Sequence, residues 1–67
     1  MNLIINSDEI RVDDSVKTVE DLLSYFQLDH KVAIVELNKE ILEKGKHAEI
    51  KLANGDVVEI VHFVGGG

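Results

Sequence analysis

The absence of cysteine is the feature that most constrains this chain, because a domain of 67 residues has few other ways to reinforce a small core. A chain of this length buries only about 60% of its unfolded surface. Without cysteine, neither a disulfide nor a thiolate metal site can add to its stability, and iron–sulfur or cysteine-nucleophile chemistry is excluded. Hydrophobic residues make up 45% of the chain, as in a folded globule. We therefore expect one domain whose few elements share one core.

The first part of the chain predicts a β-hairpin. Residues 2–6 form a short apolar run, and residues 9–12 alternate charged with apolar side chains. Ser7 and Asp8 between them are turn-forming residues. Two strands joined by a tight turn are the simplest structure that fits this pattern.

A helix is predicted over residues 18–27, where apolar residues recur at i, i+3, i+4 and i+7. These residues are Val19, Leu22, Leu23 and Phe26. Thr18 precedes them as a candidate N-cap, and Asp21 can complete a capping box. The helix should therefore begin at this point and present one apolar face to the core.

The third strand is predicted over residues 32–37. Its continuous apolar run favours a central strand that is covered on more than one side. Asn38 and Lys39 predict a turn, and residues 40–42 a brief strand.

The remaining part of the chain predicts a loop and the last strand. Residues 43–49, centred on Gly45, read as an exposed loop, and residues 50–52 alternate as a strand does. Asn54, Gly55 and Asp56 are a strong turn signal before a final strand over residues 57–64.

This element order predicts an α+β fold in which one main helix packs across a mixed sheet of four to five strands. The helix is a crossover connection between the hairpin and the third strand, so the first and last strands should lie side by side in the centre of the sheet. This arrangement is the β-grasp, or ubiquitin-like, architecture. We expect residues 1–64 to form a single β-grasp domain and residues 65–67 a flexible glycine tail.

The net charge of −6 arises from thirteen acidic and seven basic residues. A nucleic-acid backbone or an anionic membrane would repel such a chain, so neither is an expected partner. The N-terminus has no basic leader, and no apolar run approaches membrane-spanning length. We therefore expect a soluble cytoplasmic protein whose partners offer basic surfaces.

The last strand has two different faces, because alternate side chains point in opposite directions. Glu59 marks its own face as the solvent side, since a charge in mid-strand rarely faces a small core. Val61 and Phe63 share this face and are candidates for an apolar docking patch. The alternatives are that a loop covers them or that they are scattered surface residues. His62 lies on the opposite face, where we interpret it as a histidine at the core margin.

No arrangement of residues predicts catalysis or metal binding. The three serines have no histidine nearby to act as a base, and adjacent Asp13 and Asp14 read as turn residues. The three histidines, at positions 30, 47 and 62, lack the spacing of metal ligands. We therefore expect no enzyme, no metal and no bound cofactor.

The chain ends in Gly65, Gly66 and Gly67, which display one functional group, the α-carboxylate of Gly67. Reaction with ATP would convert this poor electrophile into a reactive acyl adenylate. Glycines are thin and conformationally permissive, so such a tail can enter a narrow channel of another protein.

Over essentially its whole length, the chain resembles the small sulfur carrier proteins of thiamine biosynthesis. The resemblance lies in the C-terminal "NGDVVEIVHFVGGG", the helix start "TVEDLL" and the strand "VAIVELN". Relatives often have a Gly after the Asn of this strand and a Pro-Arg pair a few residues later. This chain instead has Lys39 at the first place and Glu43-Lys44 at the second, so contacts of the middle loop are not carried over.

The resemblance implies a specific chemistry at the C-terminus. Gly67 would be adenylated by a ubiquitin-activating-type adenylyltransferase, which uses ATP and magnesium, and then converted to a thiocarboxylate with sulfur from a donor protein. The thiocarboxylate would pass its sulfur to thiazole synthase, which builds the thiazole ring. Gly66 would complete the required glycine pair and Gly65 would extend the tail. Val61, Phe63 and Val64 would be candidate contacts for these partners.

Three alternatives remain open at this point. The small subunit of molybdopterin synthase has the same fold and thiocarboxylate but a different acceptor. A ubiquitin-like tag would become amide-linked to lysines of other proteins. A β-grasp interaction module would not use its tail, so deletion of Gly66 and Gly67 would leave its function intact.

Overall fold

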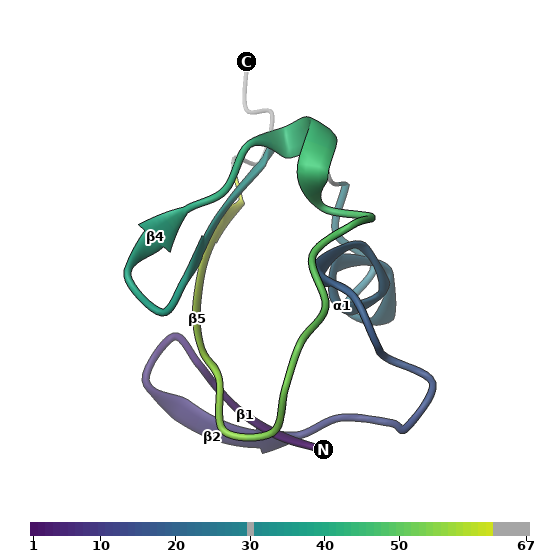
Figure 1. Ribbon diagram of the computed structural model, residues 1–67, viewed down its shortest axis with the longest axis vertical. Helices are drawn as coiled ribbons and strands as arrows, with labels where there is room; N and C mark the ends of the chain where they lie inside the picture. Colours follow the sequence, from purple (N-terminus) through teal and green to yellow (C-terminus); the bar gives the residue numbers. More distant parts are fainter. Residues whose placement is uncertain (30, 63–67) are drawn as a thin grey trace.

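The computed structural model describes residues 1–29 and 31–62, and within these ranges the elements follow the predicted order (Figure 1). A five-stranded mixed sheet lies on one side of the domain and one α-helix on the other. The elements are β1 (Asn2–Ile5), β2 (Asp8–Arg11), α1 (Val19–Tyr25), β3 (Ala33–Leu37), β4 (Glu40–Ile41), a 3-10 turn (Lys44–Lys46) and β5 (Val57–His62). The α+β class and the β-grasp arrangement are thus confirmed. Among the described residues, no helix has the length and apolar character needed to cross a membrane.

The predicted hairpin is formed by β1 and β2, which pair antiparallel from Asn2↔Arg11 to Ile5↔Asp8. Its turn is Asn6-Ser7, one residue earlier than predicted. Both residues have positive φ, +49° and +74°. A two-residue hairpin loop that follows the strand twist requires this geometry, and Asn adopts it more readily than most residues. Asp8 consequently belongs to β2.

A second hairpin of the same kind joins β3 to β4. Leu37 and Glu40 close it, and the turn residues Asn38 and Lys39 have φ of +49° and +73°. The predicted turn and the brief strand after it are therefore confirmed.

The N-terminus of α1 has the predicted capping box. The Thr18 hydroxyl accepts a hydrogen bond from the Asp21 backbone N–H at 3.1 Å, and the Asp21 carboxylate accepts one from the Thr18 N–H at 3.1 Å. Hydrogen bonds from the backbone N–H groups of Lys17 and Thr18 lower the pKa of the Asp21 carboxyl. The helix ends at Tyr25, two residues before the predicted end, because Gln27 has a positive φ of +59°.

Residues 46–52 cover the first turn of α1, where one prediction fails at a single residue and another was wrong. Backbone carbonyls of His47 and Ile50 accept hydrogen bonds from Glu20 and Val19, two of the N–H groups that a helix leaves without internal partners. The predicted exposed loop over residues 43–49 is confirmed except at His47, whose side chain is only 1% exposed, and the loop contains a 3-10 turn. The predicted strand over residues 50–52 makes a single bridge, between Lys51 and Thr18, and does not join the sheet.

The strand order β2-β1-β5-β3-β4 places the first and last strands side by side, as predicted. β1 and β5 pair parallel, and β5 pairs antiparallel with β3 on its other side. The inner face of the sheet packs against α1. The buried core residues are Leu3, Ile5, Val12, Val16, Val19, Leu22, Leu23, Ala33, Val35, Leu52 and Val58.

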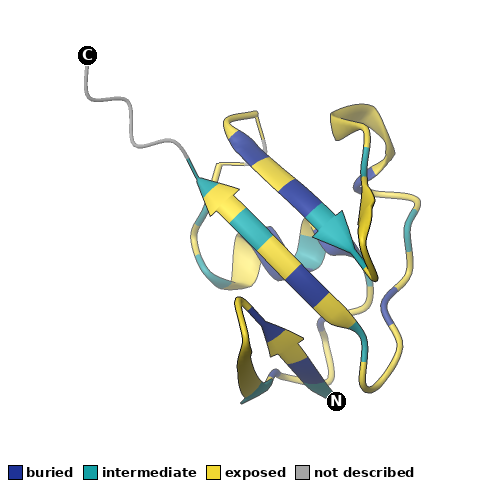
Figure 2. Cartoon of the chain, turned by 90° about the vertical axis from the view of Figure 1, so that its left-hand side faces the viewer, coloured by how far each residue is buried: buried dark blue, intermediate teal, exposed yellow. Residues whose placement is uncertain are grey.

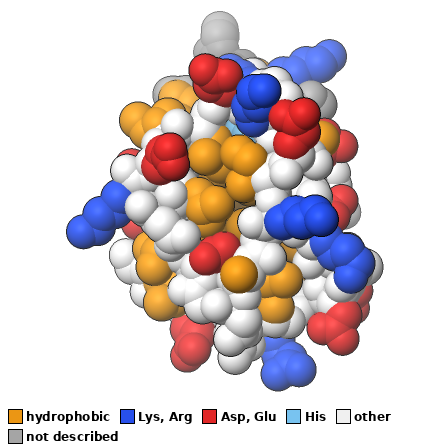
Figure 3. Space-filling view, viewed as in Figure 1, with side chains coloured by type: hydrophobic (Ala, Val, Ile, Leu, Met, Phe, Trp, Pro, Cys, Tyr) orange, Lys and Arg blue, Asp and Glu red, His pale blue; other side chains and the backbone are white. Residues whose placement is uncertain are grey.

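β3 is covered on one face only, contrary to the prediction. Ala33 and Val35 are fully buried, whereas Ile34 between them is 38% exposed. Figure 2 shows this outer face, with exposed and less exposed residues alternating along β5 and β3. On the face of Figure 3, hydrophobic side chains gather in the middle and charged ones around them. Because α1 covers only the inner face of the sheet, the domain has two layers.

Candidate functional site

The strand that leads to the C-terminal glycines is the central strand of the sheet. β3 pairs with it along its described length, from Leu37↔Val58 to Ala33↔His62. β1 pairs with only its first two residues, the last pair being Ile5↔Val58. Beyond Val58, the side of β5 that faces away from β3 has no neighbouring strand, so its backbone groups need another partner.

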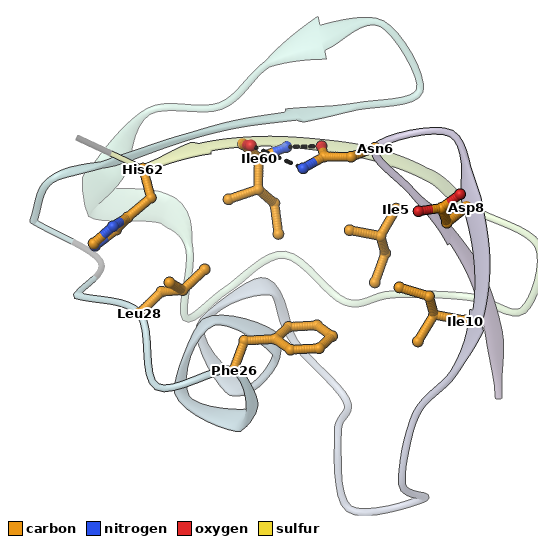
Figure 4. A pocket seen from close by; sticks show the side chains of 8 residues that line it. All are labelled: Ile5, Asn6, Asp8, Ile10, Phe26, Leu28, Ile60 and His62. Carbon is orange, nitrogen blue, oxygen red and sulfur yellow. Dashed lines mark hydrogen bonds between the residues drawn. The ribbon is translucent and has the colours of Figure 1, made fainter. Parts of the chain in front are cut away.

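The side chain of Asn6 replaces that missing neighbour. Its Oδ1 accepts a hydrogen bond from the Ile60 backbone N–H at 2.7 Å, and its Nδ2 donates one to the Ile60 carbonyl at 3.2 Å (Figure 4). The amide thus bonds both backbone groups of Ile60, which a longer β1 would otherwise bond through two of its residues. β5 is therefore fixed on both sides as far as Ile60.

The outer face of the sheet carries the predicted docking residue Val61, which is 52% exposed. Ile34 lies directly opposite it on β3 and is also exposed. Nearer the start of β5, exposed Val57 lies opposite exposed Ile4 of β1. We call these four residues and the glutamates between them, Glu36 and Glu59, the outer face.

Glu59 and Glu36 face each other across β5 and β3, between the two apolar pairs. Like charges at directly opposed positions destabilise a sheet. The predicted solvent side of β5 is confirmed for Val57, Glu59 and Val61. The sequence analysis did not identify Ile4 and Ile34 as residues of this exposed face. Ile34 could have been found only from the alternation of buried and exposed side chains along a strand, and the apolar residues on both sides of it conceal this alternation.

Several predicted site residues lie outside the described residues. They are Phe63, Val64, Gly65, Gly66 and Gly67. Their roles in docking and in tail chemistry therefore stay predictions. Val61 is the predicted contact residue that the structure does place.

His62 lies on the inner face of β5 and is half-buried, in agreement with its interpretation as a residue at the core margin. Its Nε2 is inaccessible to solvent and has no hydrogen-bond partner within residues 1–29 and 31–62. The ring borders a cavity beside the end of α1 (Figure 4).

Each of the adjacent carboxylates Asp13 and Asp14 interacts with a backbone nitrogen. Asp13 accepts a hydrogen bond from the Ser15 backbone N–H at 2.9 Å. Hydrogen bonds from the side chain and then the backbone of Ser15 lower the pKa of the Asp13 carboxyl. Asp14 lies 3.6 Å from the N-terminal ammonium of Met1. In the described part of the chain, no group of three or more His, Cys, Asp or Glu residues is arranged to hold a metal ion.

Comparison with known proteins gives consistent results over the whole chain. The sequence model of the ThiS family matches residues 2–67. The sulfur carrier protein ThiS of Bacillus subtilis is 46% identical over 65 residues, which cover 97% of this chain and 98% of that protein. The crystal structure of a thiamine biosynthesis protein (ThiS) from Geobacter metallireducens is similar with a TM-score of 0.82 and 36% identity, and both chains are covered completely.

A larger protein contains a similar segment. Thiazole synthase of Paramagnetospirillum magneticum is 42% identical over 67 residues, which are all of this chain and 20% of that protein.

Proposed function

The chain belongs to the ThiS family, the small sulfur carriers of thiamine biosynthesis, and from this premise we propose that it carries sulfur as a thiocarboxylate on Gly67. It is a carrier and not itself a catalyst. Gly66 completes the glycine pair of the tail and Gly65 extends it. The carrier acts in the cytoplasm.

One observation of the structure carries this proposal: the strand that leads to the tail is fixed on both sides. β3 holds β5 to His62, and Asn6 holds it at Ile60. Residues 63–67 then span at most about 17 Å when fully extended. A rigid body with a short reactive end allows a partner to bind the body and act on the tail.

The proposed reaction has two steps, and a partner enzyme catalyses them. A carboxylate oxygen of Gly67 attacks the α-phosphorus of ATP, which is bound with magnesium by a ubiquitin-activating-type adenylyltransferase, and pyrophosphate leaves. Sulfide (HS⁻) released by a donor protein then attacks the acyl carbon, AMP leaves with the electron pair of the broken C–O bond, and the proton of the sulfide passes to solvent. The product is a C-terminal thiocarboxylate, and this chain contributes the acyl group.

We propose thiazole synthase as the acceptor of the sulfur. The thiazole synthase of Paramagnetospirillum magneticum resembles this chain along one fifth of its length, so that protein joins a carrier-like segment to a synthase. This arrangement supports a thiazole synthase partner over the molybdopterin acceptor that shares the carrier chemistry.

The outer face is the proposed docking surface for these partners. Val61 and Ile34 form its exposed apolar pair closest to the end of β5, and Phe63 and Val64 are proposed to extend it. A basic side chain of the partner placed between Glu36 and Glu59 would relieve their repulsion. An apolar surface with a basic group is therefore the complement we expect.

Intact mass spectrometry tests the proposal. The protein is incubated with an adenylyltransferase of the family, ATP, magnesium and a sulfur donor, and a gain of about 16 Da is expected for replacement of one oxygen by sulfur. The gain should lie in the C-terminal peptide, and a chain without Gly66 and Gly67 is the control. An unchanged mass with an enzyme that activates another ThiS protein would refute the proposal. Amide-linked conjugates instead would establish a protein tag.

A further inference from the structure

A cavity of about 390 Å³ lies between the sheet and the C-terminal end of α1, beside the end of β5 (Figure 4). Its volume is at the small end of the range of sites that bind small molecules, about 300–1,000 Å³. The residues that line it include Asp8, Ile10, Phe26, Leu28, Ile60 and His62.

The walls of the cavity combine an apolar surface with one unused polar atom. Phe26, Leu28 and Ile60 are only partly buried, and their side chains extend towards the cavity in Figure 4. The Nε2 of His62 is buried and has no hydrogen-bond partner among the described residues. A polar atom in this state costs folding free energy until a partner satisfies it. The walls therefore suit an apolar group that also carries a hydrogen-bonding atom.

Charge limits the kind of group further. Asp8 lies at the end of the cavity opposite His62 (Figure 4), and the whole chain carries a net charge of −6. An anionic group would be repelled, so the occupant is neutral or cationic. Side chains with an aromatic body and one polar atom, tyrosine and tryptophan, meet these requirements.

The position of the cavity indicates which molecule supplies this group. His62 is both a wall residue and the last described residue before the tail. An enzyme that acts on Gly67 must reach to within about 17 Å of His62, because five residues span no more. The active site of this enzyme therefore lies within about 17 Å of a wall residue of the cavity.

We propose that the cavity receives a tyrosine or tryptophan side chain of the adenylyltransferase, an inference that rests on the proposed function. The ring packs against Phe26, Leu28 and Ile60, and its polar atom forms a hydrogen bond with His62 Nε2 after the imidazole turns to present this atom, which is inaccessible in the free protein. Buried aromatic anchors of this kind supply much of the affinity of protein interfaces. The cavity thus makes a second contact, on the inner side of β5, in addition to the outer face.

Two test variants and one control variant examine the contact through the rate of ATP–pyrophosphate exchange as a function of carrier concentration. Ile10→Trp fills the cavity from β2, and Ser24→Trp places the same ring on an exposed position of α1 as a matched control. We expect Ile10→Trp to raise the KM for the carrier about tenfold with kcat within about twofold, and Ser24→Trp to change neither. His62→Phe keeps an aromatic ring at this position but removes both ring nitrogens, and should raise KM about fivefold. Circular dichroism establishes that each variant is folded.

A chemical probe checks the cavity without any substitution. Indole added to the wild-type protein should shift the amide resonances of Leu28, Ile60 and His62, and should raise the apparent KM of the carrier by competition. An unchanged KM for folded Ile10→Trp and for His62→Phe would overturn the inference. So would indole that binds without affecting KM, because the cavity would then be a small-molecule site. Absence of exchange with the wild-type chain would refute the proposed function itself.

Discussion

Replacement of Asn6 by alanine should destabilise the domain more than an exposed position normally allows. The substitution removes both hydrogen bonds to Ile60. It also places alanine at a backbone φ of +49°, which is unfavourable for an L-residue with a Cβ. Both effects act at the point where β5 has lost its β1 partner.

The magnitude follows from these two effects. Each hydrogen bond contributes a net 0.5–1.5 kcal/mol on average, and water can solvate the freed groups of Ile60 at this exposed site, so the pair is worth about 1–2 kcal/mol. The left-handed backbone adds about 1 kcal/mol. The sum of about 2–3 kcal/mol corresponds to a loss of about 10–20 °C in Tm for a domain of this size.

Thermal unfolding followed by circular dichroism measures this loss, and Asn6→Gly is the matched control. Glycine tolerates the positive φ but lacks the amide, so its loss should be about 1 kcal/mol smaller than that of alanine. Amide hydrogen exchange should show faster exchange at Ile60 in both variants. If both variants unfold within about 3 °C of the wild type, the amide does not stabilise β5 and our reasoning about its role is refuted.

Four further predictions concern the rest of the fold and the tail. Lys39→Gly should raise the free energy of unfolding in urea by about 0.5–1 kcal/mol, because φ of Lys39 is +73°. Thr18→Ala should lower it by about 1 kcal/mol through loss of the N-cap, and unchanged stability would contradict the capping box. Asp21→Asn should destabilise the protein at pH 7, and the difference should vanish as the pH falls below the ordinary carboxyl value of 3.8. This direction follows from the lowered pKa of Asp21 in the folded protein. The carboxylate adds to the free energy of unfolding only while it is ionised. A pH-independent difference between the two proteins would contradict this assignment. Deletion of Gly66 and Gly67 should leave Tm unchanged while it abolishes the 16 Da gain, because glycines bury no apolar side chain.

Features that depend on neighbouring residues in the chain were predictable from the sequence. The capping box needs only Thr18 and Asp21, and the alternating faces of β5 follow from the charge of Glu59 within an apolar run. The first turn was displaced by one residue because Asn6, Ser7 and Asp8 are all common in turns. Positive φ at the two central positions selects Asn6-Ser7.

Features that depend on distant parts of the chain were not predictable. The apolar run around Ile34 suggested cover on both faces, but α1 covers only the inner one and Ile34 is part of the outer face. His47 was placed in an exposed loop because its neighbours are polar, yet its segment packs over the first turn of α1. Asn6 gave a turn signal, and nothing in the sequence indicated that its amide reaches Ile60.

The position of β5 between two strands has a mechanical consequence. Under the proposed function, an enzyme that draws the tail into its active site would pull on β5, and we consider a pull along the axis of this strand. The hydrogen bonds to β1, Asn6 and β3 lie across this axis, so they are loaded in shear and share the force. At an edge strand pulled sideways, the bonds would open one at a time. The body can therefore be held by its C-terminal end repeatedly without unravelling, which suits a carrier that is loaded, unloaded and used again.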